Sequence, residues 1–198
     1  MRVALIIVTI GIIVPMFGSC IFAPKKEPNP PSETPAAYLP LTARENLLNN
    51  LELAYNERNF ERFRELFDST EDIFLFFFSP NDVKDGLVKN SQWDLGRELA
   101  ATEAMFAQGG APGEPIAESI RLELIYVENE DEWQPFTPSS HPNETWYDRS
   151  VEYFLEVRVG VTTYSQRAPV LALFTVRQVT VDGNDIWQIV TWRDDLAN

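Results

Sequence analysis

The chain has 198 residues and a net charge of -14 at pH 7. Such a charge repels nucleic acid and anionic lipid headgroups, since binding to either requires a cationic surface that releases counterions. Hydrophobic residues make up 44% of the chain and aromatic residues 12%, which is enough apolar material for a packed core and excludes an intrinsically disordered chain.

The amino terminus has the three regions of a secretory signal peptide. Arg2 supplies a positive charge, residues 3–14 are almost wholly apolar, and small side chains follow at Gly18 and Ser19. The apolar run is too short for a membrane-spanning helix, which needs ~20 such residues. We therefore expect residues 1–19 to be a cleaved leader.

Residues 16–20 resemble the lipobox of bacterial lipoproteins, in which small residues precede a cysteine that receives a diacylglyceryl thioether. Gly18, Ser19 and Cys20 match this pattern, and Phe17 stands where an aliphatic residue is usual. Cys20 is also the only cysteine of the chain, and lipidation explains an unpaired cysteine in an exported protein. The alternative is an uncleaved signal anchor with a free thiol.

This resemblance implies a protein anchored by lipid in the bacterial cell envelope. Two acyl chains, or three, anchor a protein firmly, because each buried methylene contributes ~0.8 kcal/mol. Ile21 stands where lipoproteins retained in an inner membrane usually carry Asp, which favours the outer membrane where one exists. The expected partners are the membrane, through this anchor, and an envelope protein or a small apolar ligand. Nucleic acid is not expected.

Residues 20–40 are expected to form the lipidated cysteine and a proline-rich tether. Six prolines lie between residues 24 and 40. They favour an extended, semi-rigid chain that rises ~3.1 Å per residue. A proline-rich ligand for a recognition domain is the alternative. One folded domain is then expected at residues 41–198.

Three amphipathic segments predict helices in the first half of this domain. Thr42 and Glu45 have the spacing of a capping box, after which an apolar stripe of leucines begins. A second, short helix follows Asn59 and forms a hairpin with the first. Ser91 is placed to cap a third helix, which ends near Gln108 before two glycines.

Apolar runs and alternating patterns predict the strands. A buried strand rich in Phe is expected between the second and third helices, and long strands follow the third helix. Asp182, Gly183 and Asn184 are a strong turn signal before the last strand. The final three strands should form an antiparallel meander. The predicted strands cover residues 72–78, 120–126, 151–161, 170–181 and 186–193.

This order of elements resembles the nuclear transport factor two-like fold, over residues 42–195. The resemblance also rests on Trp93, Met105 and Phe106 around the third helix and on the closing strand at residues 186–192. It implies an α+β fold in which a curved antiparallel sheet wraps around an N-terminal helical hairpin and a third helix, as a cone-like roll. A cystatin-like arrangement or another α+β roll satisfies most of the same observations.

In the superfamily that the chain resembles, enzymes carry out acid-base catalysis with an Asp, His or Tyr side chain inside the cone. Such catalysis needs a side chain whose pKa burial has brought toward neutrality. The sole histidine, His141, lies in a loop between prolines and is expected on the surface. The acidic run at residues 128–132 lacks the spacing of a calcium-binding loop. A metal site made of His and Cys ligands is also excluded, because the chain has one His and one Cys and the Cys is expected to be lipidated. We therefore expect no metal, no cofactor and no catalytic residue that a motif would identify.

Aromatic residues are the candidate binding surface. The connection at residues 128–148 is longer than the ~12 to 15 residues of most loops, and we expect it to fold over one end of the cone. Covering a sheet edge is the alternative. Aromatic residues on the helices and strands are candidates for a pocket wall, although such residues more often fill a core. The candidate pocket or binding-surface residues are Tyr55, Trp93, Trp133, Trp146, Tyr147, Tyr153, Trp187 and Trp192.

Charged residues on the predicted strands allow two interpretations. One is a buried charge array; the other is a set of cross-strand ion pairs on a solvated sheet face, which costs less. We expect the second. The residues concerned are Arg121, Glu123, Glu156, Arg158 and Arg177.

Three functions remain open. The first is a non-catalytic domain that binds a protein or a small apolar ligand near the membrane, because no acid-base pair is evident. The second is an isomerase- or dehydratase-like enzyme that uses a buried carboxylate such as Asp72 or Asp94. The third is a structural or assembly role through the outer face of the sheet.

Overall fold

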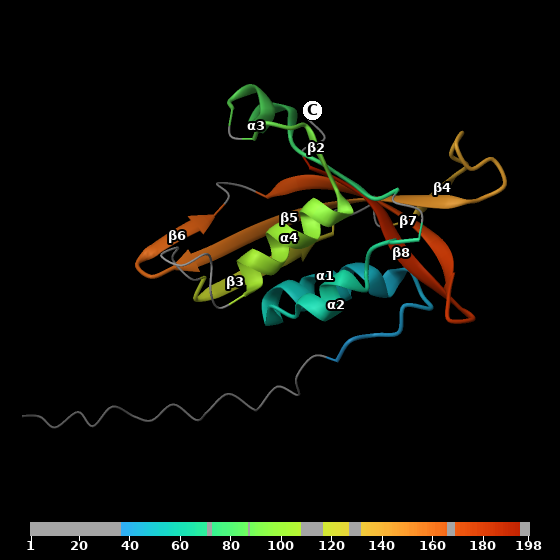
Figure 1. Cartoon of the computed structure of the whole chain (residues 1–198), viewed down its shortest axis with the longest axis horizontal. Coiled ribbons are helices and arrows are strands. Elements are labelled where there is room, and N and C mark those ends of the chain that lie inside the picture. Colours follow the sequence, from blue (N-terminus) through green and yellow to red (C-terminus); the bar gives the residue numbers. More distant parts are fainter. Residues whose placement is uncertain are drawn as a thin grey trace, which may run out of the picture. The chain divides into compact units, whose positions relative to one another are not determined.

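The computed structural model describes residues 37–70, 73–86, 88–107, 117–126, 132–165 and 169–194 (Figure 1). The predicted leader, Cys20 and most of the predicted tether lie outside these residues. Ala36–Asn198 is one compact unit with its own hydrophobic core, so we expect it to fold without the preceding residues. None of the helices among the described residues is long and apolar enough to cross a membrane.

The described residues confirm the predicted order of the main elements and add a short helix and three short strands. The helices are α1 (Glu45–Glu57), α2 (Phe60–Arg64), α3 (Pro80–Lys84) and α4 (Leu95–Phe106). The strands are β1 (Leu75–Phe77), β2 (Gln92–Asp94), β3 (Ser119–Ile125), β4 (Gln134–Phe136), β5 (Trp146–Val159), β6 (Thr162–Ser165), β7 (Val170–Val181) and β8 (Asn184–Asp194).

The strands form one curled sheet in the order β2-β1-β8-β7-β5-β3, and β4 and β6 also pair with β5. The pairings are antiparallel except that of β1 with β8, which is parallel. The predicted meander is confirmed, because β5 pairs with β7 and β7 with β8. Asp182 (φ 50°) and Gly183 (φ 80°) make the predicted tight turn between β7 and β8. The pairing of β7 with β8 shifts register between Thr175 and Val176, where Val190 of β8 is the extra residue of a bulge that helps to bend the sheet.

Helices α1 and α4 pack against one face of this sheet, and α2 packs against both of these helices (Figure 1). Leu47, Leu51 and Phe63 are fully buried there, and each such side chain contributes ~1.5 to 3 kcal/mol of hydrophobic free energy. The Tyr55 ring meets the rings of Phe63 and Phe106 edge-on, with centroids 5.4 and 5.2 Å apart. The described residues therefore form the predicted α+β roll, in which a curved sheet wraps around the hairpin of α1 and α2 and around α4.

Helix α1 does not begin with the predicted capping box. Its N-cap is Arg44, which makes no capping hydrogen bond through its side chain, and Thr42 lies in a turn before the helix. The preceding chain is held by the buried Asn50 side chain, which exchanges hydrogen bonds of 2.9 and 2.8 Å with the backbone of Leu39. This contact fixes the direction of the chain before α1, and Thr42 does not cap the helix.

The third predicted helix begins later than expected. Gln92–Asp94 pairs with β1 as strand β2, so Ser91 caps nothing, and the Asp94 carboxylate instead accepts a hydrogen bond of 2.8 Å from the backbone N–H of Arg97. This N-cap sets where α4 begins. The buried residues of α4 are Glu98, Thr102 and Phe106, which lie four residues apart on one face.

Candidate functional site

A cavity of about 220 Å³ lies between α1, α4 and the strands of the sheet that face them. It is somewhat smaller than the ~300 Å³ from which most ligand pockets start, so it suits a small molecule. Six aromatic residues are the largest group in its wall: Tyr55, Phe76, Phe78, Trp93, Tyr153 and Trp192. The aliphatic residues are Ala101, Met105, Leu122 and Leu155, and the polar ones are Glu98, Thr102 and Asp194.

The aromatic wall is built from rings that support one another. The Trp192 ring lies 6.3 Å from that of Tyr55 and 5.9 Å from that of Tyr153, both edge-on. Trp93 packs edge-on against Phe78 with centroids 4.6 Å apart. Such contacts add to the energy of burial and hold the rings in place. The structure thus brings together four of the predicted pocket residues, Tyr55, Trp93, Tyr153 and Trp192.

Glu98 is the buried acid of this cavity. Its side chain is 5% exposed, and its Oε1 accepts a hydrogen bond of 3.2 Å from the Thr102 hydroxyl. The pKa of Glu98 is raised from 4.5 to about 7: burial is the main cause, the Thr102 hydrogen bond opposes it, and the nearby Asp194 carboxylate adds a smaller upward effect. The carboxyl group can therefore gain and lose a proton near neutral pH.

Two further polar groups lie around Glu98. Burial raises the pKa of Tyr55 well above its usual value, the Glu98 charge adds to this, and a hydrogen bond with Thr102 lowers it. At the end of β8, the Trp192 Nε1 donates a hydrogen bond of 2.8 Å to the Asp194 carboxylate. Tyr55 is thus a neutral hydroxyl at ordinary pH, and Asp194 is oriented by a ring of the cavity wall.

The sequence did not lead us to Glu98 as the buried acid; Asp72 and Asp94 were the candidates. Asp94 is exposed and serves as the N-cap of α4, so it is not the buried acid that was suggested. Asp72 lies outside the described residues. The signal for Glu98 was its place on the apolar face of the helix, four residues before Thr102.

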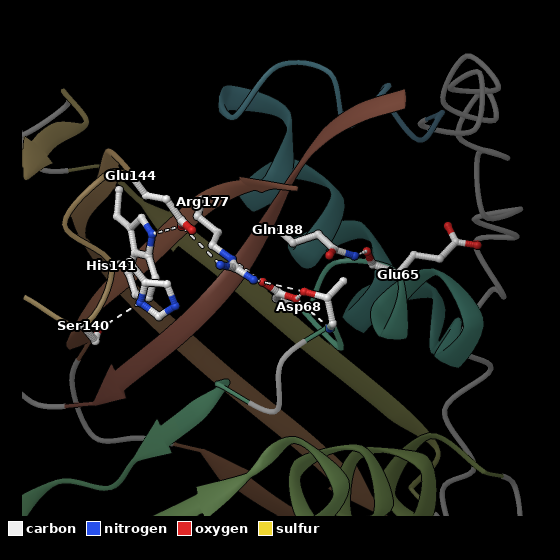
Figure 2. Close-up of polar contacts among 9 residues, drawn as sticks. Glu65, Asp68, Ser140, His141, Glu144, Arg177 and Gln188 are labelled. Atoms are coloured by element: carbon white, nitrogen blue, oxygen red, sulfur yellow. Dashed lines mark hydrogen bonds and ion pairs between the residues drawn. The ribbon is translucent and has the colours of Figure 1, made fainter. Parts of the chain in front are cut away.

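A second polar cluster lies away from the cavity, around Arg177 on β7 (Figure 2). The Arg177 Nε donates to the Asp68 carboxylate at 2.5 Å, and its other nitrogens donate to Thr70 at 3.0 Å and to Glu144 at 3.2 Å. The Trp146 Nε1 donates to the same Glu144 oxygen at 2.8 Å. These hydrogen bonds join β7, the chain after α2 and the chain before β5.

Arg177 contradicts the prediction that the strand charges lie on a solvated face. Its side chain is 5% exposed and that of Asp68 is fully buried, so this is a buried ion pair. Arg121 and Glu123 are exposed, as expected, but their ion pair of 2.7 Å runs along β3 and not across two strands. Since Val176 belongs to the hydrophobic core and side chains alternate along a strand, Arg177 points to the opposite face of the sheet.

The remaining predicted aromatic residues lie outside the cavity. The Trp146 ring lies against the Arg177 guanidinium. The ring of His141, which is half-buried, has its centroid 5.0 Å from that of Trp146. Tyr147 and Trp187 meet edge-on at 5.4 Å, beneath the guanidinium of Arg44. Trp133 is buried in the core. No described residue of the connection at residues 128–148 lines the cavity.

Two other depressions are larger but poorer candidates. One, of about 380 Å³, lies along the outer side of α1 and is lined by small, polar and aliphatic side chains without an aromatic ring. The other, of about 320 Å³, lies beside Tyr147 and Trp187, and its charged groups, Arg177 and Glu144, already bind each other. The aromatic cavity with Glu98 is therefore the candidate site.

No family model and no curated protein matches the chain. Among solved structures, the chain is similar to a protein of Thiobacillus denitrificans provisionally described as a calcium/calmodulin-dependent protein kinase type II association domain. The TM-score is 0.48 at 16% identity, over 79% of this chain and 97% of that one.

Two other similar structures carry provisional names of enzymes. One is a dehydratase of the nuclear transport factor two-like family from Streptomyces avermitilis, with a TM-score of 0.49 and 10% identity over 78% of this chain and 94% of that one. The other is an aromatic ring hydroxylase from Novosphingobium aromaticivorans, with a TM-score of 0.49 and 9% identity over 79% and 88%. Likeness at this level does not tell what this chain binds.

Proposed function

We propose that the domain binds a small, largely apolar molecule in the aromatic cavity and does so at a bacterial membrane to which Cys20 anchors it. The observation that supports binding is the cavity itself, whose wall contains six aromatic rings and the buried carboxyl group of Glu98. An apolar wall with few polar groups is the usual composition of a small-molecule site. A core built only for stability has no need of a buried acid, because burying it costs free energy.

A neutral aromatic probe tests the binding. We expect 2-naphthol to quench the tryptophan fluorescence of residues 36–198, because Trp93 and Trp192 line the cavity. The substitution Ala101→Phe fills the cavity from α4 and should weaken binding by about tenfold or more. Ala104→Phe is the matched control, since Ala104 is exposed on the same helix and does not line the cavity. Equal binding by both variants would exclude the cavity as the site.

The membrane anchor is a separate part of the proposal. It is supported by the short apolar leader and by the small residues before the only cysteine. In bacteria that express the whole chain, we expect labelled palmitate to enter the protein and the Cys20→Ser variant to remain unlabelled. Mass spectrometry of the purified protein should find residues 1–19 removed. An intact leader with an unmodified thiol would contradict the anchor and leave the ligand proposal standing.

A second candidate, acid-base catalysis, is favoured by the pKa of Glu98, which burial raises to about 7. A general base works best when its pKa lies near the operating pH. We would follow the exchange of α-hydrogens of 2-tetralone in D₂O by NMR. Exchange that the wild type accelerates and Glu98→Gln abolishes would favour an enzyme, and equal exchange by both proteins would leave binding as the function.

A further inference from the structure

The cavity combines aromatic faces with acidic groups. Glu98 is 5% exposed, and Asp194 lies on the same wall. Among the described residues that line the cavity there is no Lys, Arg or His. From this combination we infer that the ligand is a small organic ammonium ion with an apolar body. The inference rests on the proposed function, since it specifies the chemical class of the molecule that the cavity binds.

The aromatic rings are suited to a cation because their faces carry partial negative charge. An ammonium group within about 6 Å of a ring centroid is attracted by it, most strongly by tryptophan and more when the site is desolvated. The cavity offers Trp93 and Trp192 together with Tyr55 and Tyr153. The protein itself shows the same preference elsewhere: the Arg44 guanidinium lies 4.0 Å from the ring centroid of Tyr147.

Among the residues that the structure describes, Glu98 has no cationic partner in the cavity. The groups that face it are the Thr102 hydroxyl, the Tyr55 hydroxyl and the Asp194 carboxylate, and the last of these is repulsive. Its neighbour on α4, Arg97, stacks over Trp93 at 5.0 Å and does not line the cavity. A bound ammonium would therefore supply the opposite charge that Glu98 lacks, and would lower its raised pKa.

Within the described part of the chain, the helix and strands that pack against α4 bring no other cation to Glu98. On α2, Arg62 and Arg64 form ion pairs with Glu65 and Glu61 at the surface. Strand β1 is wholly apolar, and β2 contributes only Trp93 to the cavity. The net charge of -14 also attracts small cations toward the protein and repels anions.

A matched pair of probes tests the inference. 2-Phenylethylammonium and 2-phenylethanol have nearly the same shape and differ in charge. Calorimetry on residues 36–198 at a pH of about 8 should find the ammonium bound about tenfold more tightly than the alcohol, or better. At a pH of about 5.5, where Glu98 is mostly protonated, this preference should shrink to a few-fold. Near neutral pH, ammonium binding should release a proton, measured in buffers of different ionisation enthalpy.

The variant Glu98→Gln keeps the shape and removes the charge. It should lose most of the preference for the ammonium, so that the two probes bind with similar affinities. Glu103→Gln, an exposed position on the same helix, makes the same change in net charge and should keep the preference. The pH dependence of the wild type gives the same answer without any variant.

The outcomes separate the two proposals. Equal affinity for both probes at a pH of about 8 would overturn the ammonium inference and leave the binding of an apolar ligand intact. Tighter binding of the alcohol would have the same meaning. If neither probe binds, and 2-naphthol does not bind either, both proposals fail.

Discussion

The substitution Asp68→Asn should lower the free energy of unfolding by about 3 kcal/mol or more. Asp68 and Arg177 are both buried, and the Asp68 carboxylate accepts a hydrogen bond of 2.5 Å from the guanidinium (Figure 2). The neutral amide keeps the shape of the carboxylate but removes its charge. The buried Arg177 guanidinium then has only the half-exposed Glu144 as its anionic partner among the described residues. Urea denaturation of residues 36–198, followed by circular dichroism, measures the loss.

An exposed ion pair provides the control. Glu123→Gln breaks the ion pair with Arg121 on β3. The Arg121 side chain is 65% exposed and that of Glu123 47%, so the free energy of unfolding should fall by only ~0 to 1 kcal/mol. Replacing both buried partners, with Asp68→Leu and Arg177→Met, should recover part of the loss, because no charge of the pair is then buried alone. Equal losses for Asp68→Asn and Glu123→Gln would show that the buried pair matters no more than a surface pair.

The long strands and the first helices could be predicted because their patterns are local. The apolar run over β7 was placed at the bounds that the structure has, and the turn at Asp182 and Gly183 followed from residues that accept positive φ. The start of α4 could not be predicted in the same way. Ser91 and Asp94 are both suitable caps, and the choice depends on the pairing of β2 with β1, which joins residues far apart in the sequence.

The candidate site was predicted in part. Tyr55, Trp93, Tyr153 and Trp192 were named as pocket residues from their large, amphipathic side chains, and the fold brings them to one cavity. Glu98 was missed because a charged residue in a helix is usually taken to face water. Its spacing from Thr102 and Phe106 placed it on the apolar face, and that position was the available signal.

Arg177 shows the limit of local reasoning. We expected it on a solvated face, although it interrupts a strand that is apolar on both faces, a position that favours burial. Its partner Asp68 is 109 residues away in the chain, and nothing near either residue points to the other. Burial could therefore have been inferred from the sequence, whereas the compensating charge required the fold.

The substitution Glu98→Gln should make the domain more stable at alkaline pH, by about 2 to 3 kcal/mol at a pH of about 8. The pKa of Glu98 is raised by burial from 4.5 to about 7, so the folded protein holds a proton that the unfolded chain has released. Between these two values the folded state binds more protons, and its stability falls as the pH rises. Glutamine keeps a hydrogen-bonding group beside Thr102 and has no charge to bury.

The pH dependence of this difference distinguishes it from a general effect of the substitution. Below a pH of about 4, Glu98 is protonated in both states, so wild type and variant should differ little. The gap should open from a pH of about 4.5 to about 7 and then level off. Urea denaturation at a series of pH values measures it, with Glu103→Gln as the exposed control. A gap that is constant over the whole range would mean that Glu98 titrates normally, and the cavity would then hold an ordinary solvated carboxylate.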